Sequence, residues 1–186
     1  MQSFEIKKNH DWETFVDRHP LRFFCEEVSC EQFLRYASET LNLTMQHVLK
    51  DLKPPLDATA LEEKLRAEGV ILKIEKGGGG GGRTGDFYAV SWSDPHENRL
   101  FLNENILDRL KSAAVHEKSM ECPDYTVMKS MILAHEWFHI LFANAPHPGW
   151  WKKLSESVKI ISEEIAARCF SVKITGAELS PVDLDN

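Results

Sequence analysis

The sequence predicts an α+β fold, in which a short sheet of three strands is surrounded by helices. Residues 70–74, 86–93 and 99–103 have the length and the β-branched or aromatic content of strands. Apolar residues recur at helical spacing both before and after these strands. With 186 residues and 42% hydrophobic residues, the chain has the size of one domain that buries a core. We expect the sheet to be antiparallel or mixed.

Residues 1–53 are expected to form a helical segment that packs on the core. Asn9 or Asp11 can cap a first helix, because short polar side chains accept hydrogen bonds from the free N–H groups at a helix start. Pro20 ends that helix, since proline lacks a backbone N–H and its ring disturbs the preceding turn. The Pro-Pro pair at 54–55 then separates this segment from the rest of the chain.

A second helix is predicted after Ser29 and Gln32, which have the spacing of a capping box. Residues 42–44 favour the start of a further short helix. Two short helices joined by a tight turn are also compatible with a helix-turn-helix. The segment has few basic residues, so we prefer a helical scaffold to a DNA-binding motif.

Residues 54–175 are expected to form the core domain. Its first element is a helix over residues 57–68, which Asp57 or Thr59 caps. Gly69 stops this helix, because glycine readily adopts the left-handed conformation at a helix C-terminus. The strand at 70–74 follows directly.

Turns and flexible segments connect the remaining elements. Six consecutive glycines at 77–82 lose much backbone entropy when they are ordered, so we expect a flexible connection, natural or engineered. Residues 94–98 contain the Pro and Asn of a turn, which predicts that the second and third strands form an antiparallel hairpin. A short helix at 104–110 and a loosely ordered tail at 176–186 complete the core prediction.

The most informative feature for function is an H-E-x-x-H motif formed by His135, Glu136 and His139. It lies in an apolar run that predicts a helix over about 125–143, capped by Asp124. Residues four apart in a helix lie about one turn apart on one face, so two imidazoles can bind one Zn²⁺. The carboxylate of Glu136 then reaches water at the metal rather than the metal, as a hydrolytic site requires.

A hydrolytic zinc site needs a third protein ligand and an open position. A metzincin would have Gly and His where this chain has Phe142 and Ala145, so that class is excluded. The alternative is a glutamate on the last long helix, which Trp150 and Trp151 are expected to begin and which runs to about Ile174. Glu163 and Glu164 are both candidates on that helix.

Of these two glutamates we prefer Glu164 as the third ligand and keep Glu163 as the alternative. The row of the helix that holds Glu164 carries small residues and lies beside an apolar stripe, so it can approach the H-E-x-x-H helix closely. We expect the row of the helix that holds Glu163 to be more exposed to solvent. The stripe consists of Leu154, Val158, Ile161, Ile165 and Val172.

Charge and composition exclude several classes. A net charge of −7 disfavours non-specific nucleic-acid binding. No N-terminal apolar leader and no run of membrane-spanning length are visible, so we expect a cytoplasmic protein without membrane contact. The four cysteines form no C-x-x-C pair, and we expect them to be reduced.

The order of elements and the motifs resemble the ImmA/IrrE-like zinc metallopeptidases, within the gluzincin group. The matching segments are 69–74, 99–103, 131–139 and 163–171. The chain resembles a distant member, because Trp137 and Phe138 stand where the family usually has a Leu-Gly or similar small pair. The resemblance implies a small zincin-like fold, a bound Zn²⁺ and a cytoplasmic endopeptidase whose substrate is a protein or peptide, often a regulator such as a repressor.

In this interpretation His135, His139 and Glu164 hold Zn²⁺, and Glu136 is the general base. A donor to the oxyanion is also required, and five residues are candidates: His147, Tyr125, Tyr88, His116 and Arg83. A hairpin edge could hold an extended peptide by backbone pairing. Two further hypotheses are a zinc hydrolase that does not act on peptides and a binding module with a catalytically idle site.

Overall fold

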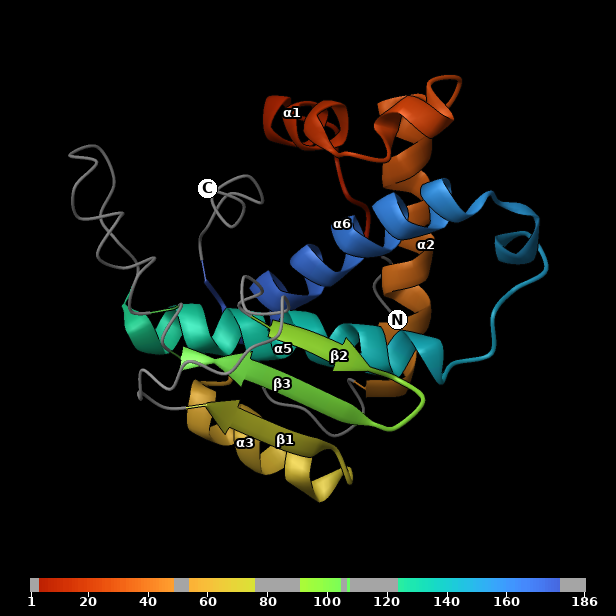
Figure 1. Ribbon diagram of the computed structural model, residues 1–186. Helices are drawn as coiled ribbons and strands as arrows, with labels where there is room; N and C mark the ends of the chain where they lie inside the picture. The colour runs from red at the N-terminus through yellow and green to blue at the C-terminus, as the bar shows by residue number, and fades with distance from the viewer. Residues whose placement is uncertain (1–3, 49–53, 76–90, 105–106, 108–123, 178–186) are drawn as a thin grey trace, which may run out of the picture.

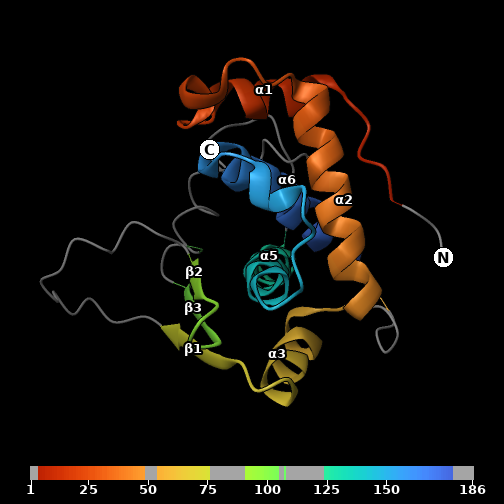
Figure 2. The ribbon, with the colours of Figure 1, turned by 90° about the vertical axis from the view of Figure 1, so that its right-hand side faces the viewer.

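The computed structural model describes residues 4–48, 54–75, 91–104, 107 and 124–177. In this part of the chain, helices pack on one face of a three-stranded sheet, which confirms the predicted α+β class (Figure 1). Figure 2 looks along helix α5 (Tyr125–Ala143) and shows the sheet on one side of it, with the other helices around its remaining faces. Among the described residues, no helix is long and apolar enough to cross a membrane.

The first helix follows the local cap signal. Helix α1 (His10–Arg18) begins after Asn9, whose side chain accepts a hydrogen bond of 3.0 Å from the backbone N–H of Trp12. Of the two predicted caps, Asn9 is therefore the one that is used. A short 3-10 helix, η1 (Arg22–Cys25), leads to the next long element.

Helix α2 (Cys30–Val48) starts with the predicted capping box. The N–H of Gln32 donates to Ser29 Oγ at 3.2 Å, and the N–H of Ser29 donates to Gln32 Oε1 at 2.8 Å. The helix then continues without a break, so the separate helix predicted from residues 42–44 is wrong. The reason is tertiary: the Asn42 side chain does not cap a helix but pairs with both the N–H and the C=O of Phe4, at 2.8 and 2.7 Å. The unbroken helix also removes the basis for a helix-turn-helix.

Helix α3 (Ala58–Ala67) and strand β1 (Ile71–Glu75) begin the core as predicted. Asp57 caps α3 by accepting from the N–H of Ala60 at 2.8 Å. Gly69 has φ +76°, the left-handed conformation that allows the chain to leave the helix and enter the strand.

The sheet is mixed, with the strand order β1-β3-β2. Strand β3 (Arg99–Asn103) pairs in parallel with β1 and antiparallel with β2 (Ser91–Asp94), so the predicted hairpin around residues 94–98 is confirmed. Strand β2 is an edge strand within the described part of the sheet. The start of the predicted second strand (86–90), the glycine run (77–82) and the tail after 177 lie outside the described residues, as does most of 104–110.

The two C-terminal helices form the centre of the molecule. Helix α5 has the predicted bounds and the predicted cap, Asp124. Helix α6 (Glu156–Thr175) packs across both α5 and α2. The prediction that Trp150 and Trp151 begin the last helix is wrong, because a separate 3-10 turn, η2 (Trp151–Lys153), is followed by extended backbone and a new cap at Ser155.

Candidate metal centre

Helix α5 presents His135 and His139 side by side toward α6. Their Nε2 atoms are 3.1 Å apart, and their ring planes meet at 71° with centroids 4.9 Å apart. Both rings are mostly covered, with 17% and 16% of the side chain exposed. The i, i+4 spacing therefore directs the same ring nitrogen of each histidine to one point.

Helix α6 supplies Glu164 to the same point. One carboxylate oxygen lies 3.4 Å from His135 Nε2, and the other lies 3.5 Å from His139 Nε2. The three residues form a group whose potential ligand atoms all lie within 4.8 Å of one another. Ligand atoms bound to tetrahedral zinc at about 2.0–2.1 Å lie about 3.3 Å from one another. The two Nε2 atoms are 3.1 Å apart, close to that spacing, and each of them has a different oxygen of the Glu164 carboxylate at 3.4 or 3.5 Å.

Small residues let α6 approach α5 closely enough for this contact. Ala167 lies three residues after Glu164 on the same face of α6 and is fully buried, and Ile161 and Ile165 lie in the core beside it. A large side chain at Ala167 would push the helices apart and carry the carboxylate of Glu164 away from the histidines.

Glu163 lies on the far side of the His139 ring. Its Oε1 is 2.7 Å from His139 Nδ1, whereas Nε2 of the same ring faces Glu164. The expectation that Glu163 is the more solvated of the two is wrong: its side chain is 26% exposed, against 29% for Glu164. Because an ionised carboxylate only accepts, His139 donates from Nδ1 to Glu163, and its Nε2 side faces Glu164.

The charges around this point favour a cation. Burial acts to raise the pKa of Glu164, but the interactions with His135, His139 and Arg168 outweigh it and lower the pKa to about 2. Burial acts to lower the pKa of His139, but the neighbouring carboxylates of Glu163, Glu164 and Glu136 raise it. These pKa shifts reflect attraction between the imidazole rings and the carboxylates in the metal-free protein. Two imidazole nitrogens and a carboxylate that converge on one position also form a ligand set that fits a divalent metal ion.

Glu136 lies outside this three-residue group, as its place in the motif predicts. Its Oε1 accepts a hydrogen bond of 2.6 Å from the hydroxyl of Ser91 on β2. The residue is only 8% exposed. Ser91 did not emerge from the sequence, because nothing local marks it and 45 residues separate it from Glu136.

The two residues between Glu136 and His139 point into the core. Trp137 and Phe138 are fully buried and pack on Phe170 of α6, and the Trp137 indole N–H donates to Glu68 Oε2 at 3.2 Å. The large pair at these positions therefore fills space between α5, α6 and α3, on the face of α5 that does not carry the histidines.

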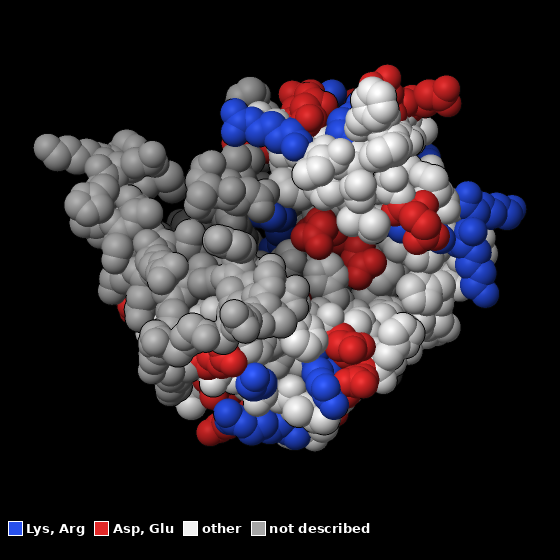
Figure 3. All heavy atoms as spheres, viewed as in Figure 1, with Lys and Arg blue, Asp and Glu red and all other residues white. Residues whose placement is uncertain are grey.

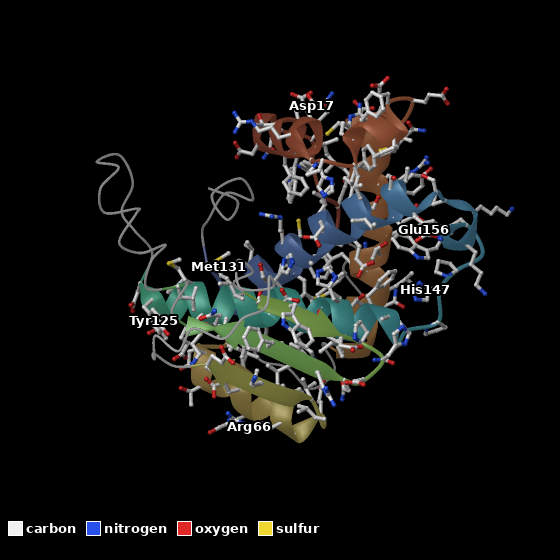
Figure 4. All side chains as sticks on the ribbon, in the orientation of Figure 1. Asp17, Arg66, Tyr125, Met131, His147 and Glu156 are labelled. Carbon is white, nitrogen blue, oxygen red and sulfur yellow. The ribbon has the colours of Figure 1, made fainter. Side chains whose placement is uncertain are left out.

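Two of the five candidate oxyanion donors belong to the described residues. Figure 4 shows Tyr125 at the start of α5 and His147 beyond its opposite end. His147 packs edge-on against Phe142, with ring centroids 4.6 Å apart, and lies beside Trp151. Tyr88, His116 and Arg83 lie outside the described residues.

The surface above the sheet is hollowed on one face. Figure 3 shows acidic side chains gathered in this hollow, between the N-terminal helices and the sheet.

Comparison of the chain with models of known protein families, with curated proteins and with solved structures finds no match in any of the three.

Proposed function

We propose that this chain is a zinc-dependent endopeptidase, as its resemblance to the ImmA/IrrE-like gluzincins implies. The observation that carries the proposal is the convergence of His135, His139 and Glu164, whose potential ligand atoms lie within 4.8 Å of one another, with the two histidine Nε2 atoms 3.1 Å apart. That convergence suits three tetrahedral ligands and leaves the fourth position for water or substrate.

His135, His139 and Glu164 would hold the metal, and Glu163 would orient His139 through Nδ1. Zinc bound there supplies Lewis acidity toward a substrate carbonyl and toward water. This ligand set would carry one formal negative charge, from the carboxylate of Glu164, because histidines bind metal as neutral imidazoles.

Glu136 is the residue that moves the proton in this proposal. Its carboxylate takes a proton from the attacking water and returns it to the nitrogen of the leaving amine. Its Oε1 accepts a hydrogen bond from Ser91, so Oε2 is the oxygen with more lone-pair capacity for that proton. Burial of the group excludes bulk water, which strengthens its interaction with charge that develops on the substrate.

Strand β2 supports a peptide as the substrate. β2 pairs on one side with β3, and no described strand pairs with its other side, so β2 is an edge to which an extended peptide could add by backbone hydrogen bonds. A peptide laid along this edge would lie beside Ser91 and hence beside Glu136. Extended backbone, rather than one side chain, would then be the main feature that the site binds.

The test combines metal analysis with cleavage assays. We expect one zinc per chain, cleavage of unfolded protein or peptide substrates, and Glu136→Gln protein that keeps zinc but loses cleavage. Absence of stoichiometric metal would refute the site. Zinc binding without any hydrolysis would indicate a binding module, and hydrolysis of esters or small amides alone would indicate a zinc hydrolase of another class.

A further inference from the structure

The hydrogen bond between Ser91 and Glu136 joins the sheet to the H-E-x-x-H helix. Its length of 2.6 Å falls in the range of O–H···O⁻ bonds to an ionised carboxylate. A carboxylate only accepts, so the single hydroxyl proton of Ser91 must be directed at Oε1. The bond therefore restrains both groups, and the strand and helix that carry them.

The register of the sheet places Ser91 at this position. Ser91 is paired with Leu102 and Trp92 with Phe101, and successive side chains alternate between the two faces of a strand. Leu102 is buried on the inner face, while the Trp92 ring stacks on Phe101 on the outer face. A shift of one residue would replace the hydroxyl with the indole of Trp92.

We propose that Ser91 is a positioning residue for Glu136, and that it aligns this carboxylate with a substrate held along strand β2. This inference rests on the proposed peptidase function. Glutamate has three rotatable side-chain bonds, and Ser91 is the hydrogen-bond partner of Oε1 among the described residues. With Oε1 held, Oε2 is left in a defined direction to exchange a proton with water.

The bond also sets the distance between substrate and base. A peptide paired with the free edge of β2 takes its position from the β2 backbone. Ser91 belongs to the same strand, so its hydroxyl places Glu136 relative to the peptide as well as relative to the histidines. Loss of the hydroxyl therefore affects the rate of the bound complex more than the affinity for the peptide.

Four variants test the role of Ser91. Ser91→Ala removes the hydroxyl, Ser91→Thr keeps it, and Ser93→Ala is the matched control because Ser93 lies on the same face of β2 two residues along the strand. Glu136→Gln provides the reference for loss of the base. For each variant, kcat and KM are measured on a peptide substrate, zinc affinity by chelator competition, and stability by thermal unfolding. The carboxyl ¹³C NMR signal of Glu136 is recorded in metal-free protein and is assigned by its loss in Glu136→Gln.

We expect Ser91→Ala to lower kcat roughly tenfold to a hundredfold with little change in KM, since a small misplacement of a reacting group has an effect of this size. Zinc affinity should stay at the wild-type level, and the melting temperature of Ser91→Ala should fall by only a few degrees, because a buried carboxylate loses one hydrogen-bond partner. Ser91→Thr should restore kcat, and Ser93→Ala should behave as wild type. The carboxyl signal of Glu136 should shift in Ser91→Ala and not in Ser93→Ala.

Wild-type kcat in Ser91→Ala would overturn the inference while the proposed peptidase function stands. A fall in kcat that comes with loss of zinc, or that Ser91→Thr fails to restore, would also overturn it. An unchanged carboxyl signal of Glu136 in Ser91→Ala would overturn the inference whether or not the protein cleaves peptides. A shifted signal in a wild-type protein that cleaves no peptide would support the placement of Glu136 by Ser91, and only the proposed peptidase function would fail.

Discussion

Replacing each of the two adjacent glutamates of α6 tests how the metal is held. Glu164→Gln removes the negative charge from the group formed with His135 and His139. The free energy of zinc binding at structural sites with four ligands is about 10–16 kcal/mol. Divided equally, each ligand contributes about 2.5–4 kcal/mol. Loss of the binding free energy contributed by one ligand weakens zinc binding by about 100- to 1,000-fold. We expect activity to fall with it.

Replacement of Glu163 should lower the zinc affinity less than replacement of Glu164, and the size of the loss should depend on the residue introduced. Glu163 contacts His139 Nδ1 at 2.7 Å and not the Nε2 side, so it orients a ligand. Loss of such a partner weakens metal binding by about 10- to 100-fold. Glu163→Ala should show this loss, whereas Glu163→Gln should lose less, because an amide oxygen still accepts from Nδ1–H.

Zinc titration against a competing chelator measures these affinities, and circular dichroism checks that each variant is folded. Glu156→Gln is the matched control, since Glu156 lies on the same helix with 80% of its side chain exposed. If Glu163→Gln releases zinc and Glu164→Gln does not, Glu163 is the ligand. If neither variant changes the affinity, α6 does not hold the metal.

Three further predictions concern stability. Chelation should lower the melting temperature of the wild-type protein, since zinc at 1,000 times its Kd adds about 4 kcal/mol to the free energy of unfolding; an unchanged melt would argue against a metal site. Lys129→Met should lower that free energy by about 2–3 kcal/mol in urea unfolding, because Lys129 bridges Glu62 and Glu104 at 2.7 and 2.8 Å and all three side chains are less than 20% exposed. The same difference should depend on pH: burial acts to raise the pKa of Glu62, but Lys129 and Arg66 lower it below its ordinary value of about 4.3. A lowered carboxylate pKa contributes stability above the ordinary pKa, so the gap between wild type and Lys129→Met should be constant from about pH 5 to 8 and shrink below about pH 4.3; a constant gap down to pH 3 would contradict this.

Helix starts were predictable because a cap depends on residues within about three positions. Asn9, Asp57 and Asp124 each cap the helix expected of them, and Ser29 and Gln32 form their reciprocal pair. The same local nature makes the H-E-x-x-H spacing informative, since one helical turn suffices to bring the two histidines together.

Helix continuity was harder to predict, since partners far along the chain decide it. The Asn42 side chain carries the same donor and acceptor groups as a cap, but it pairs with Phe4, 38 residues away. Near the C-terminal helix, Trp151 is buried beside Phe142 in the separate turn η2, and helix α6 begins only after Ser155. The start of α6 at Ser155 is again a local cap, whose hydroxyl accepts from the N–H of Val158, whereas nothing near Asn42 marks its pairing with Phe4.

The histidines and Glu136 could be read from the sequence, but the roles of their partners were decided by tertiary packing. Adjacent helical residues differ by about 100° in direction, so whether Glu163 or Glu164 meets the Nε2 atoms depends on how α6 rotates when its small residues pack on α5. Ser91 reaches Glu136 only because the register between β2 and β3 turns its hydroxyl inward. A sequence records spacing along one helix, whereas the contact between two elements depends on the rotation and register that burial of their apolar faces selects.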